Sequence, residues 1–131
     1  METQICVDTD ILADFLRNKP EAVEWIKINE KKNVLVTTII NLFELYYGAY
    51  KSKFTEQNIN AVQALAQRLL ILNLTDESVR MAGELLAQLE RTGQYIDFRD
   101  VLIGATALKE NCAIKTRNTK HFSRIDGLKL A

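Results

Sequence analysis

The sequence predicts an α/β domain built on a mostly parallel β-sheet. Short apolar segments of strand type alternate along the chain with amphipathic segments of helical period. The length of 131 residues suits one compact domain, and an apolar fraction of 47% with 26% charged residues is typical of a protein with a single core. One Pro, five Gly and no low-complexity segment leave no candidate linker. We therefore expect one domain over residues 1–131.

Five segments have the composition of strands. Residues 5–7 are apolar and end at a polar Asp-Thr-Asp sequence, which marks the end of the first strand. Residues 34–40 form a longer apolar run, typical of a strand that is buried on both faces. The three remaining strands are expected at residues 70–74, 113–116 and 128–130.

Six helices are expected, most of them beginning at a recognisable start signal. Asp10 is expected to cap a helix over residues 11–16, Pro20 to lie in the first turn of the next, and Asn41 to cap a helix over residues 42–51. Residues 117–127 are expected to be a loop between the last two strands. The other three helices are predicted at residues 55–69, 75–91 and 100–109.

Composition excludes several classes of protein. No apolar run approaches the roughly 18 residues of a transmembrane helix, and the acidic start Met-Glu-Thr-Gln is unlike a signal peptide, so a cytoplasmic protein is expected. Cys6 and Cys112 lie far apart in apolar stretches and are expected to be buried free thiols. With one His in the chain, no zinc constellation is possible. Zero net charge argues against a diffuse basic surface that binds nucleic acid.

Four acidic residues are candidates for chemistry because they are expected at the edge of the sheet where the strands end. Asp8 directly follows the first strand, Glu44 lies in the most apolar helix start, and Asp97 and Asp100 precede a helix that is apolar on almost every side. Each also has a simpler interpretation. Asp8 and Asp100 could be turn or cap residues, Asp97 a solvated loop acid, and Glu44 the partner of Asn41 in a capping box.

Gathered together without a counter-ion, these acids would repel one another and raise one another's pKa values. A hard divalent cation such as Mg²⁺ or Mn²⁺, bound through oxygen ligands and waters, would relieve that repulsion. Such a site suits the hydrolysis of a phosphodiester by water. No Ser/His/Asp or Cys/His set competes with this interpretation, since His121 is the only imidazole and lies in a basic segment.

With these residues in place, the sequence resembles the PIN-domain family, and within it the VapC-type toxins of toxin–antitoxin pairs. The resemblance covers the whole chain, with four motifs in the family's order. They are Asp8-Thr9-Asp10; Thr37-Thr38 through Glu44-Leu45 and Gly48; Asp100-Val-Leu-Ile-Gly-Ala-Thr-Ala; and Thr116-Arg117-Asn118 with Phe122 and Gly127-Leu128.

The resemblance implies a three-layer fold with four or five strands in the central sheet. It also implies a Mg²⁺- or Mn²⁺-dependent endoribonuclease that inhibits growth by cleaving RNA, is silenced by a cognate VapB-type antitoxin, and forms a homodimer. Asp8 and Asp100 would be the main metal ligands, with Glu44 as a further ligand or a base that orients water. Thr9 and Thr116 would hydrogen-bond the carboxylates.

Two departures from the family pattern make the expected site less negative. The family's fourth acidic position falls on Asn118, which would complete the site through its amide oxygen. Many members have Asp just before the closing Phe, where this chain has His121. Asp97 is expected to restore part of the negative charge that these two departures remove. Arg117 is a candidate for contact with a substrate phosphate, although a solvated surface Arg is an equal alternative.

By the same analogy, the apolar helices over residues 11–16 and 42–50 would form the groove into which an antitoxin inserts. Four aromatic residues near this groove are candidate anchors for a partner helix or a second copy, or simply core residues. They are Tyr46, Tyr47, Tyr50 and Phe54.

Three other functions remain open. The chain could be a degenerate PIN module that only binds a partner, with Asn118 as the sign of lost activity. Asp8-Thr9-Asp10 also resembles the nucleophile motif of haloacid-dehalogenase-type phosphatases, although Leu12 stands where that motif has Thr or Val. A phosphorelay receiver domain would use Asp76 and Lys115, and would leave Glu44 without a role.

The net charge of zero is compatible with a nuclease if the charges are segregated. Removing Asp8, Glu44, Asp97 and Asp100 leaves 17 basic residues against 13 acidic ones, a net charge of +4. From residue 111 to the end, five basic residues face a single acid. We therefore expect an acidic pocket beside a basic closing segment and weak, salt-sensitive RNA binding.

Overall fold

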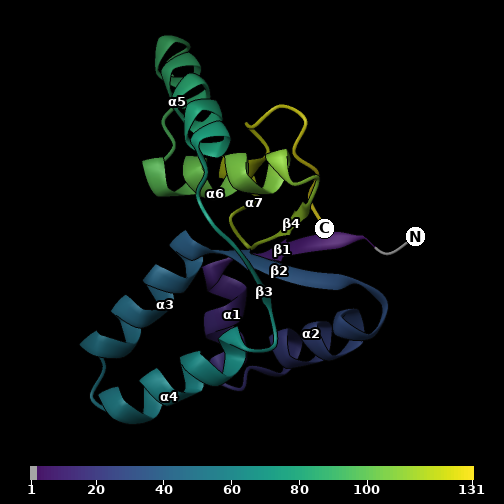
Figure 1. Ribbon diagram of the computed structural model, residues 1–131, viewed down its shortest axis with the longest axis vertical. Coiled ribbons are helices and arrows are strands. Elements are labelled where there is room, and N and C mark those ends of the chain that lie inside the picture. The colour runs from purple at the N-terminus through teal and green to yellow at the C-terminus, as the bar shows by residue number, and fades with distance from the viewer. Residues whose placement is uncertain (1–2) are drawn as a thin grey trace.

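Four parallel strands form the centre of the molecule, in the order β3-β2-β1-β4 (Figure 1). The structure is a computed structural model that describes residues 3–131. The predicted α/β class with a parallel sheet is confirmed. The strand bounds are β1 Gln4–Val7, β2 Val34–Thr38, β3 Leu70–Leu72 and β4 Ala113–Lys115.

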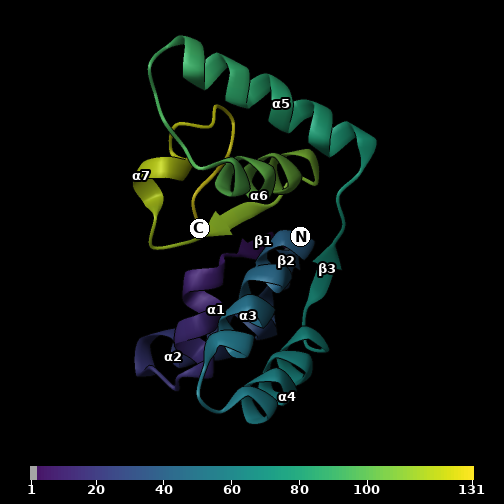
Figure 2. The ribbon, with the colours of Figure 1, turned by 90° about the vertical axis from the view of Figure 1, so that its left-hand side faces the viewer.

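Seven helices cover the sheet on both faces. Figures 1 and 2 show α1 to α4 on one side, and α5, α6 and α7 on the other. The helix bounds are α1 Thr9–Leu16, α2 Pro20–Lys32, α3 Ile39–Lys51, α4 Thr55–Ala66, α5 Asp76–Arg91, α6 Phe98–Lys109 and α7 Thr119–Phe122.

The alternation of side chains along the strands gives each face its own core. In β1, Cys6 belongs to the cluster shared with α5 and α6, whereas Ile5 and Val7 belong to the cluster shared with α1 to α4. In β2, Val36 and Leu35 are divided in the same way. The central strands are therefore buried on both sides, as the apolar run that contains β2 predicts.

The caps of α1 and α3 lie earlier in the chain than the sequence suggested. Asp8, and not Asp10, caps α1, and Thr38, and not Asn41, caps α3. Both capping residues keep the extended backbone of the strand before them, so each strand passes directly into its helix. As a result β2 ends at Thr38 instead of residue 40, and Asn41 serves as the second member of the capping box.

The C-terminal third also differs from expectation in three places. Asp97 caps α6, which moves Asp100 from the cap into the first turn. Residues 119–122, expected as part of a loop, form the short helix α7. Residues 128–130, expected as a strand, form no strand and make a single bridge, between Leu130 and Ile114.

Two expectations of composition hold. Cys6 and Cys112 are free, buried thiols. Within residues 3–131, no helix is both long and apolar enough to cross a membrane.

The closing segment packs closely on the central helix α6. Gly104 lies where a Cβ atom would run into Cδ1 of Ile125 and lie 3.5 Å from side-chain atoms of Leu128 and Phe122. Phe122 and Ile125 are almost completely buried. The absence of a side chain at residue 104 therefore lets the segment that carries residues 116–122 dock against α6.

We expect Gly104→Ala to lower the free energy of unfolding by about 1 to 2 kcal/mol, because displacing the buried Cδ1 of Ile125 costs about 1 to 3 kcal/mol and the gain in helix propensity offsets part of that cost. Gly83→Ala is the matched control, since Gly83 is also helical and a Cβ there meets nothing within 4 Å. That control should raise stability by about 0.5 to 1 kcal/mol through helix propensity. Urea denaturation measures both. Equal effects of the two substitutions would contradict the packing argument.

Candidate active site

Asp8 is the buried centre of the candidate site. It lies at the carboxyl end of β1 and is 6% exposed. Its Oδ1 accepts hydrogen bonds from the backbone N–H of Thr9 at 2.8 Å and from Nδ2 of Asn41 at 3.0 Å. Its Oδ2 accepts one from the hydroxyl of Thr116 at 2.7 Å. The neighbouring Thr9 and two residues that are remote in sequence, Asn41 and Thr116, thus hold this carboxylate in one orientation.

The charge on Asp8 is costly in this environment. Burial raises the pKa of Asp8 to about 6, against the opposing effect of the hydrogen bonds from Thr116 and Thr9. Repulsion by the carboxylates of Asp10 and Asp100 contributes to this raised pKa. Within residues 3–131, no Lys, Arg or His forms an ion pair with Asp8. Asp8 is therefore a buried carboxylate without a cationic side-chain partner among these residues.

Glu44 joins the site through a hydrogen-bonded chain that begins at Asn41. The side-chain amide of Asn41, which is completely buried, donates to the hydroxyl of Thr9 at 2.9 Å as well as to Asp8. The Thr9 hydroxyl donates in turn to Oε1 of Glu44 at 2.7 Å. The alternative capping box of Asn41 with Glu44 is wrong, because the box pairs Asn41 with Thr38. Asn41 was foreseen only as a cap, and its amide links two of the candidate carboxylates.

Asp100 approaches the site from α6 and meets the closing segment. Its Oδ2 lies 3.3 Å from Nδ2 of Asn118 and 3.3 Å from Nδ1 of His121. The backbone N–H of Asn118 donates to the hydroxyl of Thr116 at 2.9 Å, and that hydroxyl holds Asp8. The segment after β4 therefore contacts both Asp8 and Asp100.

Asp97 has a different role from the one expected. Its carboxylate caps α6 through the backbone N–H of Arg99 at 2.9 Å and contacts the Arg99 guanidinium, with Nε at 3.1 Å. Hydrogen bonds from Arg99 hold the pKa of Asp97 below its usual value. Asp97 is thus neither a free loop acid nor in contact with Asp8, Glu44 or Asp100 in this conformation.

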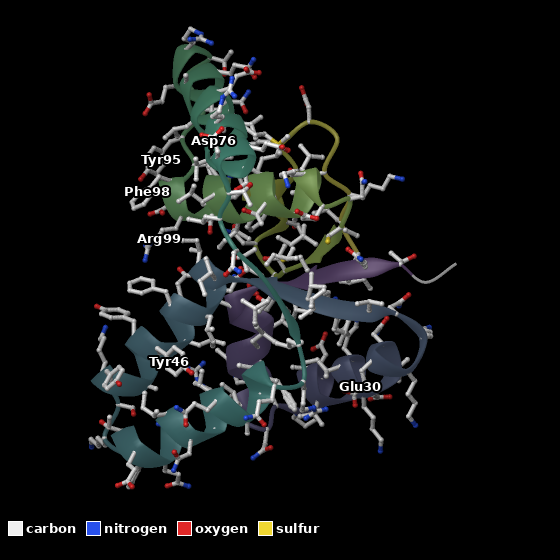
Figure 3. All side chains as sticks on the ribbon, viewed as in Figure 1. Glu30, Tyr46, Asp76, Tyr95, Phe98 and Arg99 are labelled. Atoms are coloured by element: carbon white, nitrogen blue, oxygen red, sulfur yellow. The ribbon has the colours of Figure 1, made fainter. Side chains whose placement is uncertain are left out.

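Arg99 is a residue of the site that the sequence did not single out. Its Nη1 lies 3.7 Å from Oε2 of Glu44, so its guanidinium stands between Asp97 and Glu44. Figure 3 shows Arg99 at the start of α6, beside α3. Its position between two predicted site acids, Asp97 and Asp100, is the signal that could have identified it.

Arg117 lies at the edge of the site and contacts acids of α1. Its Nε is 3.4 Å from Oδ2 of Asp14 and 3.9 Å from Oδ2 of Asp10. Its backbone N–H also donates to Asp10 at 3.0 Å. With 61% of its side chain exposed, Arg117 is still accessible from solvent.

The oxygen donors of this site suit a divalent cation that keeps several waters better than an ion held by protein ligands alone. Among residues 3–131, no three Asp, Glu, His or Cys side chains converge closely enough to hold a metal ion by themselves. Mg²⁺ commonly uses one or two carboxylates, several waters and substrate phosphates. A pair of carboxylates such as Asp8 and Asp100, with Asp8 lacking any cationic partner, fits that requirement.

A groove opens beside the site between α1, α3 and α4, with a volume of about 370 Å³. Thr9 and Glu44 line its end near the site, and Gly48 and Ala61 line its length. The interpretation of the nearby aromatic residues as core residues is wrong for Tyr47, Tyr50 and Phe54, which are 53%, 68% and 68% exposed. Tyr46 packs against the core on the α1–α4 side of the sheet.

Comparison with known proteins shows similarity over nearly the whole chain. Residues 5–128 match the model of the PIN domain family. The chain is 30% identical over 130 residues to the tRNA(fMet)-specific endonuclease VapC of Shigella flexneri, covering 98% of this chain and 92% of that protein. It is 34% identical over 123 residues to Ribonuclease VapC2 of Rickettsia felis, covering 93% of this chain and 92% of that protein.

Solved structures agree with these relatives. The crystal structure of VapBC2 from Rickettsia felis bound to a promoter DNA fragment matches with a TM-score of 0.91 and 31% identity over 98% of both chains. The DNA-bound VapBC of Salmonella typhimurium matches with a TM-score of 0.88 and 29% identity, covering 100% of this chain and 98% of that chain.

The buried charge of Asp8 predicts a stability effect in the metal-free protein. A rise in the pKa of Asp8 from about 3.9 in the unfolded state to about 6 in the folded state corresponds to a loss of about 3 kcal/mol in the free energy of unfolding. Asp8→Asn removes this cost and weakens the Thr116 hydrogen bond, so we expect a net gain of about 1 to 2 kcal/mol at pH 7.5. Because the folded state has the higher pKa, the wild type loses stability as the pH rises from about 4 to about 6.

Thermal unfolding in EDTA between pH 4 and pH 8 measures this effect. The advantage of Asp8→Asn should shrink towards pH 4, where Asp8 is protonated in the folded state and about half protonated in the unfolded state. Asp126→Asn changes an exposed acid and should show neither the gain nor its pH dependence. A wild type that is more stable than Asp8→Asn at pH 7.5 would contradict the proposed electrostatic cost.

Proposed function

The chain belongs to the PIN-domain family and, within it, to the VapC-type toxins, and on that basis we propose that it is a divalent-metal-dependent endoribonuclease. The observation that carries this proposal is the buried carboxylate of Asp8 at the carboxyl end of the sheet, which forms no ion pair with a Lys, Arg or His among residues 3–131 and feels the repulsion of Asp100. Such a charge is stabilised by a cation that is not part of the chain. The relatives named as ribonucleases and endonucleases support the same activity.

Asp8 and Asp100 would hold the cation, Mg²⁺ or Mn²⁺, with Glu44 as a further ligand or a base. When bound, the cation would supply Lewis-acid polarisation of the phosphate and neutralise its developing charge. Thr116 and Asn41 orient Asp8, and Thr9 orients Glu44. These three residues are positioning residues, since their polar side-chain atoms are already engaged with the carboxylates.

Glu44 would accept a proton from the attacking water. Thr9 occupies its Oε1 at 2.7 Å, so Oε2 is the oxygen available for the proton, with the Arg99 guanidinium 3.7 Å away. The water oxygen bonds to phosphorus, one P–O ester bond of the RNA breaks, and the leaving oxygen takes up a proton. Asn118 completes the catalytic set by fixing Asp100, and Asp97 contributes by holding Arg99 at the rim.

Arg117 is our candidate for contact with an RNA phosphate. To make a forked hydrogen bond to phosphate it must leave Asp10 and Asp14, from which it is separated by 3.9 and 3.4 Å. Its 61% side-chain exposure permits that exchange. The basic residues of the closing segment would extend the contact along the RNA backbone.

We propose further that this ribonuclease is a toxin silenced by a VapB-type antitoxin. Relatives of similar structure were solved as VapBC assemblies, two of them bound to DNA. The groove between α1, α3 and α4 would receive a segment of the antitoxin, with exposed Tyr47, Tyr50 and Phe54 as anchors for that segment or for a second copy in a homodimer. The two free thiols fit a reducing compartment, which we propose is the cytoplasm.

A partner-binding module without catalysis is the principal alternative function. The phosphatase and receiver alternatives have less support, because both oxygens of Asp8 are occupied by hydrogen bonds in a buried position. In addition, Asp76 is exposed and pairs with Arg80 of its own helix at 3.7 Å.

RNA cleavage by the purified protein tests the catalytic proposal. With Mn²⁺, the wild type should cleave RNA, and Asp8→Asn or Asp100→Asn should each lower the rate by at least ~100-fold, the upper end of the cost of losing an outer-shell partner of a metal site. EDTA should abolish cleavage. Asp126→Asn should cleave at the wild-type rate. Cleavage that survives both site substitutions, or that resists EDTA, would contradict a metal-dependent ribonuclease.

Filling the groove tests the site of inhibition separately. Ala61→Trp should leave RNA cleavage unchanged and weaken inhibition by the product of the neighbouring reading frame at least ~10-fold, because the indole occupies the groove. Ala64→Trp is the matched control, since Ala64 is exposed on the same helix and does not line the groove. Inhibition constants and rescue of growth arrest measure the effect. Full inhibition of Ala61→Trp would place the antitoxin elsewhere.

A further inference from the structure

His121 is the only imidazole of the chain, and the proposed mechanism gives it no role. It lies in α7, next to the completely buried Phe122, so its backbone is fixed by the core. Its side chain is 34% exposed and its Nδ1 faces the candidate site. Its contacts there involve two residues, Asp100 and Asn118.

The protons of these three side chains can be arranged in two ways. Nδ1 of His121 lies 2.9 Å from Nδ2 of Asn118 and 3.3 Å from Oδ2 of Asp100. If Nδ1 carries a hydrogen, it can donate to Asp100 but then opposes the N–H groups of Asn118. If Nδ1 is bare, it accepts from Asn118 and lies 3.3 Å from Oδ2 of Asp100 with no hydrogen between the two atoms.

In the second arrangement, the amide of Asn118 serves both acceptors. Its Nδ2 lies 2.9 Å from His121 Nδ1 and 3.3 Å from Asp100 Oδ2, so its two N–H groups supply the positive partners that a nitrogen and an oxygen lone pair require. A cation would meet the same requirement. Rotation of the Asn118 amide by half a turn would then turn its oxygen towards that cation as a third donor.

The spacing of the donors agrees with this interpretation. Neighbouring ligands of an octahedral ion with bonds of about 2.1 Å lie about 3.0 Å apart. The separation of 3.3 Å between Nδ1 and Oδ2 is close to that value. Imidazole nitrogen, unlike a carboxylate, favours transition cations over Mg²⁺.

We propose that His121 is a direct metal ligand, through Nδ1, at a position shared with Asp100 and Asn118, and that it gives this chain a preference for Mn²⁺ and related transition cations over Mg²⁺. This inference rests on the proposed metal-dependent function and adds a nitrogen ligand to its oxygen donors. Without the ligand role, His121 would be a hydrogen-bonding residue whose loss leaves metal preference unchanged.

A single His makes the test unambiguous. Pulsed electron paramagnetic resonance of the tag-free protein with one equivalent of Mn²⁺ should show contact coupling to an imidazole ¹⁴N, which can come only from His121. His121→Asp should bind Mn²⁺ without that coupling. Binding titrations should show that His121→Asp loses at least ~10-fold in affinity for Mn²⁺ relative to Mg²⁺.

Mn²⁺ bound to the wild type without ¹⁴N coupling would overturn the inference and leave the ribonuclease proposal intact. An unchanged ratio of Mn²⁺ to Mg²⁺ affinity in His121→Asp would overturn the preference. The wild-type spectrum needs no variant to fold, so the ligand assignment stays testable if His121→Asp is unstable. By contrast, EDTA-resistant RNA cleavage would overturn the ribonuclease proposal itself.

Discussion

The hydrogen bonds that hold the buried carboxylate of Asp8 connect the parts of the site to the sheet. Thr9, Asn41 and Thr116 donate to it from the start of α1, the start of α3 and the end of β4. These segments meet because β1 lies between β2 and β4 in a parallel sheet, so the three strands end at the same edge. The sheet order thus brings these donors to one carboxylate. Further hydrogen bonds from Asn41 to Thr9, from Thr9 to Glu44 and from Asn118 to Thr116 extend the network.

The same residues also start the helices, which ties the geometry of the site to local folding. Asp8 caps α1 and Thr38 caps α3 in a capping box with Asn41, whose amide reaches Asp8. Asp97 caps α6 and so places Asp100 in its first turn. Because each cap fixes where its helix begins, a change in a cap would move a site residue as well as destabilise a helix.

Sequence patterns predicted the α/β class and the general location of every strand that the structure contains, since apolar runs and parallel-sheet rules depend on local composition. They misplaced the caps of α1, α3 and α6 by two to three residues, because each true cap is followed closely by another residue that caps helices well. The true caps are Asp8, Thr38 and Asp97. They did not identify Asn41 or Arg99 as site residues. An amide or a guanidinium acquires its role from tertiary partners, here Asp8 and Glu44, which have no fixed spacing in sequence.

The distribution of charge explains how a neutral chain can carry an unbalanced negative charge at this site. Arg99 stands between Asp97 and Glu44, Arg117 contacts Asp10 and Asp14, and His121 contacts Asp100. Among residues 3–131, Asp8 is the acid of this group that contacts none of these cationic or imidazole side chains. It is also the acid at the sheet edge whose pKa burial raises to about 6. Equal numbers of acidic and basic residues therefore make the molecule neutral as a whole but leave the buried carboxylate of Asp8 without a cationic partner among residues 3–131. The nearby carboxylates of Asp10 in α1 and Asp100 in α6 repel its charge.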